Sequence, residues 1–187
     1  VTRQVLANYA LPLQQEIAKA YRENDKTKFN KLSAEFIELI GDMDRLLATR
    51  QDFLLGTWVA DARNCGTTDK EKALYEQNAK DLITLWGDAN NRLFEYSCRQ
   101  WSGLLTDFYK PRWQQFFAEV NANWGKFEQT TFDGKIKQWE WSWVTTRKDY
   151  PVKPVGNSAK IAEELYQKYV TRIIPLTQVM APIKYDY

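Results

Sequence analysis

The segment "KFNKLSAEFIELIGDMDRLLATR", from Lys28 to Arg50, gives the clearest structural signal in the chain. Its large apolar side chains recur at intervals of three and four residues, which is the period of an α-helix with one buried face. They are Phe29, Leu32, Phe36, Leu39, Met43 and Leu46, with Ile40 and Leu47 widening the stripe. The segment predicts a long amphipathic helix whose apolar face other helices must cover.

The flanking sequence predicts those other helices. Residues 1–23 carry a helical apolar face with Pro12 inside it, and a proline there is expected to kink or split the helix. Thr68 and Glu71 have the spacing of a capping box, and Pro111 suits the first turn of a helix. Further helices are expected over about 52–64, 69–86, 92–108, 111–125 and 158–173, with an extended tail over 174–187. The predicted fold is all-α, a single antiparallel bundle of about seven to eight helices.

One segment, "IKQWEWSWVTT" (136–146), fits two structures. Alternation of Trp139, Trp141 and Trp143 is typical of a strand, whereas the spacing of Ile136, Trp139 and Trp143 is typical of a helix. Periodicity alone does not decide between the two.

Composition excludes several classes of function. The chain has 187 residues, which fits one domain, and its 26 basic and 24 acidic residues argue against non-specific binding to nucleic acid or to a membrane surface. No apolar segment approaches the roughly 20 residues of a membrane span. The sequence opens inside a helical pattern without an initiator methionine, so it is expected to be an excised part of a longer protein.

The sequence contains no histidine, and this absence excludes Ser-His-Asp triads, Cys-His pairs and His-based metal sites within it. The two cysteines, Cys65 and Cys98, lack CxxC spacing. They are expected to pack as separate thiols, with a disulfide between them as the alternative.

Carboxylate pairs are the remaining candidates for acid–base chemistry, because glycosidases use two acids on either side of the bond they cleave. The pairs Glu35/Glu38, Asp42/Asp44 and Glu163/Glu164 all fall on helix positions expected to face solvent. Lys70, Lys72 and Lys80 are likewise expected to be solvated. Since phosphate-binding loops, nucleophile elbows and metal-ligand clusters are absent too, the residues indicate no catalytic centre, metal site or cofactor.

The excess of aromatic residues is the one unusual feature: 8 Trp, 10 Tyr and 9 Phe. Most are expected to be core, among them Trp58, Trp101, Trp113 and Trp143. Trp86 and Tyr96 differ because they flank a polar loop, Trp86 on the last turn of a helix that Gly87 stops and Tyr96 on the first turn of the next. They either belong to the core or form the wall of a pocket.

Two long segments carry a resemblance to a known family: "FLLGTWVADARNCGTTDKEKALYEQNAKDLITLWGD" (53–88) and "EYSCRQWSGLLTDFYKPRW" (95–113). They resemble the C-terminal domain of α-N-acetylglucosaminidases, glycoside hydrolase family 89, in its bacterial branch. The most specific pieces are "LLGTW", "YEQNA", "LITLWG" and "YKPRW". The resemblance spans nearly the whole chain.

This resemblance implies a parent enzyme with a small N-terminal domain, a (β/α)₈ catalytic barrel and an all-helical C-terminal domain formed by residues 1–187. The enzyme would cleave terminal α-linked N-acetylglucosamine with retention through two glutamates. Those glutamates belong to the barrel, so no catalytic residue and no metal ligand is expected here. The partners implied are the barrel and the glycan. The implied location is periplasmic or secreted in bacteria and lysosomal in the animal relatives.

The resemblance also assigns roles to single residues. Trp86 and Tyr96 match positions at the edge of the family's sugar pocket, so both are expected to bind substrate. Arg112 and Trp113 match a structural segment, and residues 136–146 match a helix with Trp141 outward. Two other classes of function compete with this interpretation. One is a helical scaffold or interaction module with no role at an active site, and the other is a nucleic-acid-binding bundle, which the near-neutral charge disfavours.

Overall fold

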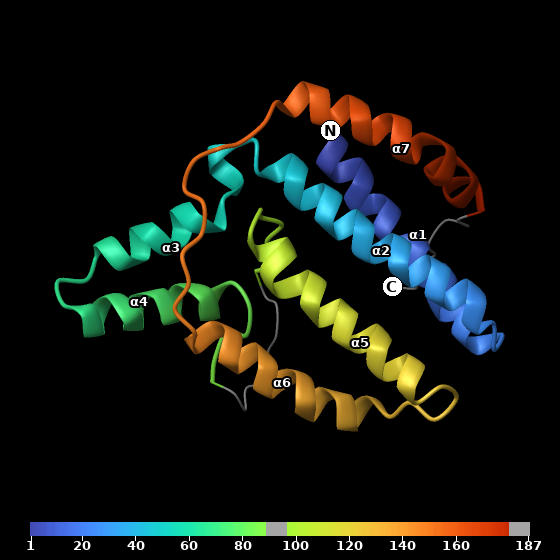
Figure 1. Cartoon of the computed structure of the whole chain (residues 1–187), viewed down its shortest axis with the longest axis horizontal. Coiled ribbons are helices and arrows are strands. Elements are labelled where there is room, and N and C mark those ends of the chain that lie inside the picture. The colour runs from blue at the N-terminus through green and yellow to red at the C-terminus, as the bar shows by residue number, and fades with distance from the viewer. Residues whose placement is uncertain (89–96, 180–187) are drawn as a thin grey trace, which may run out of the picture.

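The computed structural model describes residues 1–88 and 97–179, without the side chains of 174–179. Over these ranges the chain forms seven α-helices and no β-strand, so the all-α class is confirmed (Figure 1). The helices are α1 (Thr2–Arg22), α2 (Lys26–Leu47), α3 (Leu55–Asn64), α4 (Asp69–Leu82), α5 (Lys110–Ala122), α6 (Gln129–Thr145) and α7 (Ser158–Val179). A 3₁₀ turn, Gln51–Phe53, precedes α3, and a π-helical turn, Leu105–Tyr109, leads into α5.

The amphipathic segment 28–50 forms α2 and is the centre of the larger apolar core. The Asp25 carboxylate accepts a hydrogen bond from the Lys28 N–H and so caps the helix at its N-terminus. The predicted stripe is buried from Phe29 to Leu47 except for the partly buried Leu32, and it packs against α1, α5 and α7. Because each fully buried Leu or Phe stabilises the fold by roughly 1.5–3 kcal/mol, this stripe orders most of the molecule.

A second, smaller core joins the α3–α4 hairpin to α6. Its buried members are Leu55, Val59, Ile83, Leu85, Leu104, Phe108, Trp143 and Val144. Tyr109 packs against both cores. In Figure 1 the α3–α4 hairpin projects away from the α1–α2 pair. The end of α4 and the C-terminal end of α6 therefore meet over this second core.

Three of the carboxylates expected to face solvent are instead partly buried and accept hydrogen bonds from other segments. Asp44 on α2 accepts hydrogen bonds from the Gly103 N–H at 2.7 Å and the Ser102 hydroxyl at 3.0 Å. Glu35 accepts one from the Tyr9 hydroxyl, and Asp42 accepts one from the Tyr169 hydroxyl at 2.8 Å. The expectation failed because helical period places these positions at the edge of the apolar stripe, where a polar partner from α1, α7 or the 102–106 segment can reach them.

Two predicted helix boundaries were wrong. The helix is not split at Pro12: α1 runs from Thr2 to Arg22 with Pro12 buried inside it, and the kink given as the other expectation stays a prediction. Packing of six buried α1 residues outweighs the roughly 3 kcal/mol that an internal proline costs. The extended tail fails in part, since α7 continues to Val179, and residues 180–187 lie outside the described ranges.

The helix predicted over about 92–108 was also wrong over residues 97–103. Residues 97–101 are not helical, and the chain becomes helical again only just before the π turn Leu105–Tyr109, which continues into α5. Pro111 lies at the start of α5, as predicted. In a regular α-helix the Pro111 ring would crowd the carbonyl oxygen of Asp107, four residues earlier. The wider π turn lies at this point of the chain.

The contested segment 136–146 is helical and belongs to α6, as the resemblance implied, although Trp141 is partly buried rather than outward. Trp58 was expected in the core but is 36% exposed; its indole N–H donates to the Ala79 carbonyl oxygen at 2.8 Å. Cys65 and Cys98 are separate thiols, as expected, but both are exposed.

Gly56 is the position where the fold tolerates a side chain least. A Cβ atom there would lie 2.1 Å from the Pro151 carbonyl oxygen, so α3 and the 146–157 segment can approach only at a glycine. We expect Gly56→Ala to lower the free energy of unfolding by roughly 2–3 kcal/mol in urea denaturation. Gly134→Ala is the matched control, because a Cβ there meets no atom within 4 Å, and it should stabilise α6 by about 0.5–1 kcal/mol. Equal stability of the two variants would contradict this packing.

Candidate functional site

The turn after α4 presents Trp86 at the surface on an otherwise buried segment. Because α4 ends at Leu82, Trp86 does not lie on its last turn as predicted. Ile83, Thr84 and Leu85 are all less than 5% exposed, whereas Trp86 is 40% exposed. The turn is therefore anchored in the second core, and Trp86 is the first large side chain to leave it.

The backbone of Trp86 adopts the left-handed conformation, with a φ of 59°. An L-residue other than glycine, asparagine or aspartate rarely adopts it, and it costs roughly 1–2 kcal/mol. Gly87, predicted to stop the helix, has no positive φ; the chain reverses at Trp86 itself. A strained backbone persists only where surrounding contacts impose it, and such residues cluster at functional sites.

Those contacts converge on Asp81. Its backbone carbonyl oxygen accepts hydrogen bonds from the Trp86 N–H at 2.8 Å and the Thr84 N–H at 3.0 Å. Its carboxylate Oδ1 accepts a hydrogen bond from the Gly87 N–H at 3.2 Å. Burial raises the pKa of this carboxyl above its ordinary value. The Thr84 hydroxyl donates to the Lys80 carbonyl oxygen at 2.7 Å, which ties the turn to the last part of α4.

Two buried charges lie one helical turn apart on α4, directly before this turn. Lys80 is completely buried and Glu76 is 2% exposed, so the expectation that Lys80 is solvated was wrong. The Lys80 ammonium lies 4.0 Å from the Glu76 carboxylate, and it donates to the Thr146 carbonyl oxygen at 2.6 Å. It also lies 4.4 Å from the centroid of the Trp143 ring, a cation–π contact.

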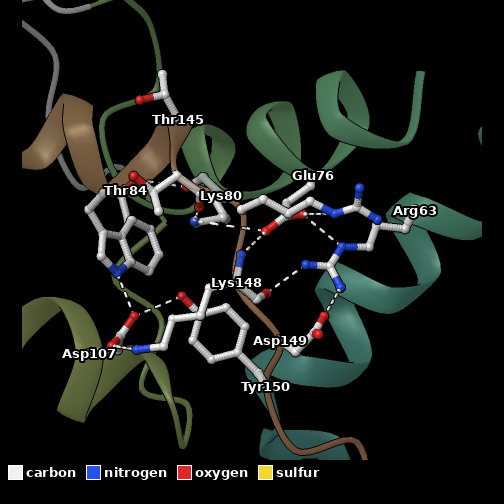
Figure 2. A network of polar contacts seen from close by, with 12 residues as sticks. Arg63, Glu76, Lys80, Thr84, Asp107, Thr145, Lys148, Asp149 and Tyr150 are labelled. Carbon is white, nitrogen blue, oxygen red and sulfur yellow. Dashed lines mark hydrogen bonds and ion pairs between the residues drawn. The ribbon is translucent and has the colours of Figure 1, made fainter. Parts of the chain in front are cut away.

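Figure 2 shows that residues of the segment after α6 lie beside these charges. The Arg63 guanidinium on α3 donates to Glu76 at 2.7 Å and also contacts Asp149. The Lys148 N–H donates to the other Glu76 oxygen at 3.1 Å. These contacts connect α3, α4 and residues 146–149 through one buried carboxylate.

Asp107, in the π turn, receives the rest of the network. Its carboxylate accepts hydrogen bonds from the Trp143 indole N–H and the Tyr150 hydroxyl, each at 2.7 Å, and pairs with the Lys148 ammonium (Figure 2). Burial alone would raise the pKa of Asp107, but these donors outweigh it and hold the pKa below its ordinary value. The carboxylate therefore stays ionised and joins α6 and residues 148–150 to the start of α5.

Arg112 and Trp113 lie on α5, away from the Trp86 turn in the sequence. The Arg112 guanidinium pairs with Glu140 on α6 at 3.1 Å, and the Trp113 ring packs edge-on against Phe36 on α2, with centroids 4.8 Å apart. Both line a groove of about 420 Å³ between α5 and α6. These contacts support the structural role that the resemblance implies for Arg112 and Trp113, which stays a prediction.

The remaining sequence-based predictions fall outside the network. Tyr96 lies outside the described residues, so its proximity to Trp86 stays a prediction. In the described part of the chain, acidic and cysteine side chains form no group that could hold a metal ion, and no helix there is long and apolar enough to span a membrane. Sequence reasoning missed Glu76, Lys80 and Asp81. Asp81 offered one signal, since a carboxylate in the last turn of a helix opposes the helix dipole.

Comparison with known proteins shows that the chain is similar to part of several glycoside hydrolases. Residues 1–168 match the family model described as the α-N-acetylglucosaminidase C-terminal domain. A human α-N-acetylglucosaminidase is 30% identical over 176 residues, which are 92% of this chain and 24% of that protein.

Two solved structures of a family 89 glycoside hydrolase from Clostridium perfringens are each 34% identical to this chain. The complex with 2-acetamido-1,2-dideoxynojirmycin has a TM-score of 0.80, and the complex with PUGNAc has a TM-score of 0.83. They cover 91% and 92% of this chain and 21% of their own length.

The fold is thus that of an all-helical domain from glycoside hydrolases. More narrowly, the chain belongs to the family of α-N-acetylglucosaminidase C-terminal domains, as the sequence resemblance implied. It spans about a quarter of the length of the human relative and about a fifth of the bacterial one.

The buried Lys80 makes stability depend on pH in a defined direction. Burial lowers its pKa from 10.5 to about 8, so between these values the unfolded chain binds more protons than the folded one. The free energy of unfolding should therefore rise with pH across this interval. Relative to Lys80→Met, which cannot titrate, the natural chain should gain on the order of 1 kcal/mol between pH 7 and pH 9.5 in urea denaturation. A constant difference between the two proteins would show that Lys80 is not buried as a cation.

Trp86 and Trp113 should differ in their contribution to stability. Trp113→Ala should lower the free energy of unfolding by about 3 kcal/mol, because it removes a ring packed among Phe36, Phe116 and Phe117. Trp86→Ala should cost well below that. Trp86→Gly should be more stable than Trp86→Ala by about 1 kcal/mol, since glycine adopts the left-handed conformation without strain. Thermal and urea melting of the three variants tests this order, and equal losses for Trp86→Ala and Trp113→Ala would assign Trp86 to the core.

Proposed function

We propose that this chain is the C-terminal domain of an exo-acting, retaining α-N-acetylglucosaminidase and that the Trp86 turn forms part of the edge of its sugar pocket. The two catalytic glutamates belong to a barrel domain of the same polypeptide, against which the helical domain packs. The substrate is a glycan with a terminal α-linked N-acetylglucosamine. The proposed location in bacteria is periplasmic or secreted.

The observation that carries the pocket role is the combination of strain and exposure at Trp86. A residue selected only for the fold would be buried or would relieve its backbone strain with glycine, whereas Trp86 is 40% exposed at a φ of 59°. Leu82, four residues earlier, is 48% exposed, so apolar surface extends beyond the indole. Apolar surface of this kind marks a place where another domain or a ligand packs.

The chemistry of an indole suits the proposed role. Its flat apolar face can stack on the C–H groups of a pyranose and keep water from the reacting carbon. This contribution is distinct from acid–base catalysis, which carboxylates of the barrel perform in this proposal. Tyr96, whose hydroxyl could bond a sugar hydroxyl, completes the same edge.

The direct test uses the whole enzyme that contains this chain, with an aryl α-N-acetylglucosaminide as substrate. Trp86→Ala should lower kcat/KM by roughly tenfold, the loss expected when one stacking contact in the transition state is removed. The control is Trp58→Ala, which removes another partly exposed tryptophan and should leave kcat/KM unchanged. The chain of residues 1–187 alone should not hydrolyse the substrate above background.

Two results would contradict the proposal. If Trp86→Ala leaves kcat/KM unchanged, the domain is a scaffold with no role at the pocket. If the chain alone turns over substrate after repurification, and loses the activity on mutation of one of its own acids, the catalytic centre lies in this domain.

A further inference from the structure

Asp81 holds the peptide units on both sides of Trp86. Its carbonyl oxygen accepts the Trp86 N–H at 2.8 Å, and its carboxylate accepts the Gly87 N–H at 3.2 Å. The first bond fixes the peptide before Trp86 and the second fixes the peptide after it. Together they constrain φ and ψ of Trp86, and hence the direction in which its side chain leaves the backbone.

The position of this carboxylate is unfavourable for the helix that carries it. Asp81 lies in the last turn of α4, where the helix dipole is negative and an acidic side chain costs about 0.3–1 kcal/mol. It is also partly buried, and burial of a carboxylate is costly unless hydrogen bonds compensate it. Helix stability therefore does not explain an aspartate here, whereas control of the following turn does.

Contacts of residues 83–85 hold the segment that precedes Trp86. Ile83 and Leu85 anchor the turn in the second core, and the Thr84 hydroxyl donates to the Lys80 carbonyl oxygen. These contacts act before Trp86 in the sequence. The Asp81 carboxylate, by contrast, reaches past Trp86 to the next peptide.

We propose that Asp81 is a positioning residue, which holds Trp86 in the left-handed conformation that aims its indole at the sugar. This inference rests on the proposed pocket role of Trp86. Asp81 itself does not touch the substrate. Its effect on the reaction passes entirely through the orientation of Trp86.

The test is a double-mutant cycle in the whole enzyme, measured with an aryl α-N-acetylglucosaminide. Asp81→Ala should lower kcat/KM by roughly threefold to tenfold and no further than Trp86→Ala does. In the Trp86→Ala background, Asp81→Ala should have no additional effect. Asp81→Asn should retain most of the activity, because an amide oxygen can accept the Gly87 N–H. Asp61→Ala, which removes an exposed carboxylate from α3, is the matched control and should be unchanged.

A second measurement separates this inference from the proposed function. Hydrogen–deuterium exchange of the peptide spanning residues 82–88, in the whole enzyme, should be faster in Asp81→Ala and near natural in Asp81→Asn. If Trp86→Ala leaves kcat/KM unchanged, the proposed function fails. If Trp86→Ala lowers kcat/KM but Asp81→Ala changes neither exchange nor kcat/KM, or if the two losses add in full, Asp81 is not a positioning residue.

Discussion

The burial of Glu76 and Lys80 one turn apart on α4 is the constraint on which the second half of the fold depends. A buried charge is tolerated only with partners, and the 4.0 Å contact between Glu76 and Lys80 within α4 leaves both charges in need of partners from other segments. Arg63 comes from α3, the Lys148 N–H from the segment after α6, and the Thr146 carbonyl oxygen from the end of α6. Because these partners belong to separate segments, α4 can occupy only one position relative to α3 and α6.

That constraint continues into the Trp86 turn. Lys80 is followed directly by Asp81, so one of the cations near the buried Glu76 carboxylate and the residue that accepts the turn hydrogen bonds are neighbours on one helix. The buried pair holds α4 against α3 and the end of α6, and Asp81 accepts hydrogen bonds from the next residues. An exposed indole at the end of such a rigid support loses little conformational entropy on contact with a ligand, which is the advantage of a preorganised site.

Local patterns in the sequence predicted the elements whose cause is local. The 28–50 stripe, the Thr68–Glu71 capping box and the Pro111 helix start all appear in the structure, because period, cap and proline act within a few residues. Lys80 was predicted to be solvated because the sequence does not reveal its distant partner. The ammonium donates to the carbonyl oxygen of Thr146, which lies 66 residues later in the sequence. The wrong 92–108 helix has the same origin, since Ser102 and Gly103 are held by Asp44 of α2 rather than by a helix of their own.

The candidate site, too, was predicted only in part from the sequence. The proposal that Trp86 lies at the pocket rests on family resemblance and on the adjacent polar loop, not on helical periodicity, which placed Trp86 wrongly on a helix. Its strained backbone could not be foreseen, because a left-handed tryptophan depends on hydrogen bonds to a residue five positions earlier. Asp81 carried a detectable signal, an acid at the unfavourable end of a helix, and this sign can be sought in other sequences.

A crystal structure of the whole enzyme with 2-acetamido-1,2-dideoxynojirmycin bound is the most direct test of the account. The account predicts that the Trp86 indole lies in van der Waals contact with the bound ring, within about 4 Å, while its backbone keeps the left-handed conformation. A Trp86 side chain packed away from the pocket, on a surface that the bound ring does not approach, would contradict it.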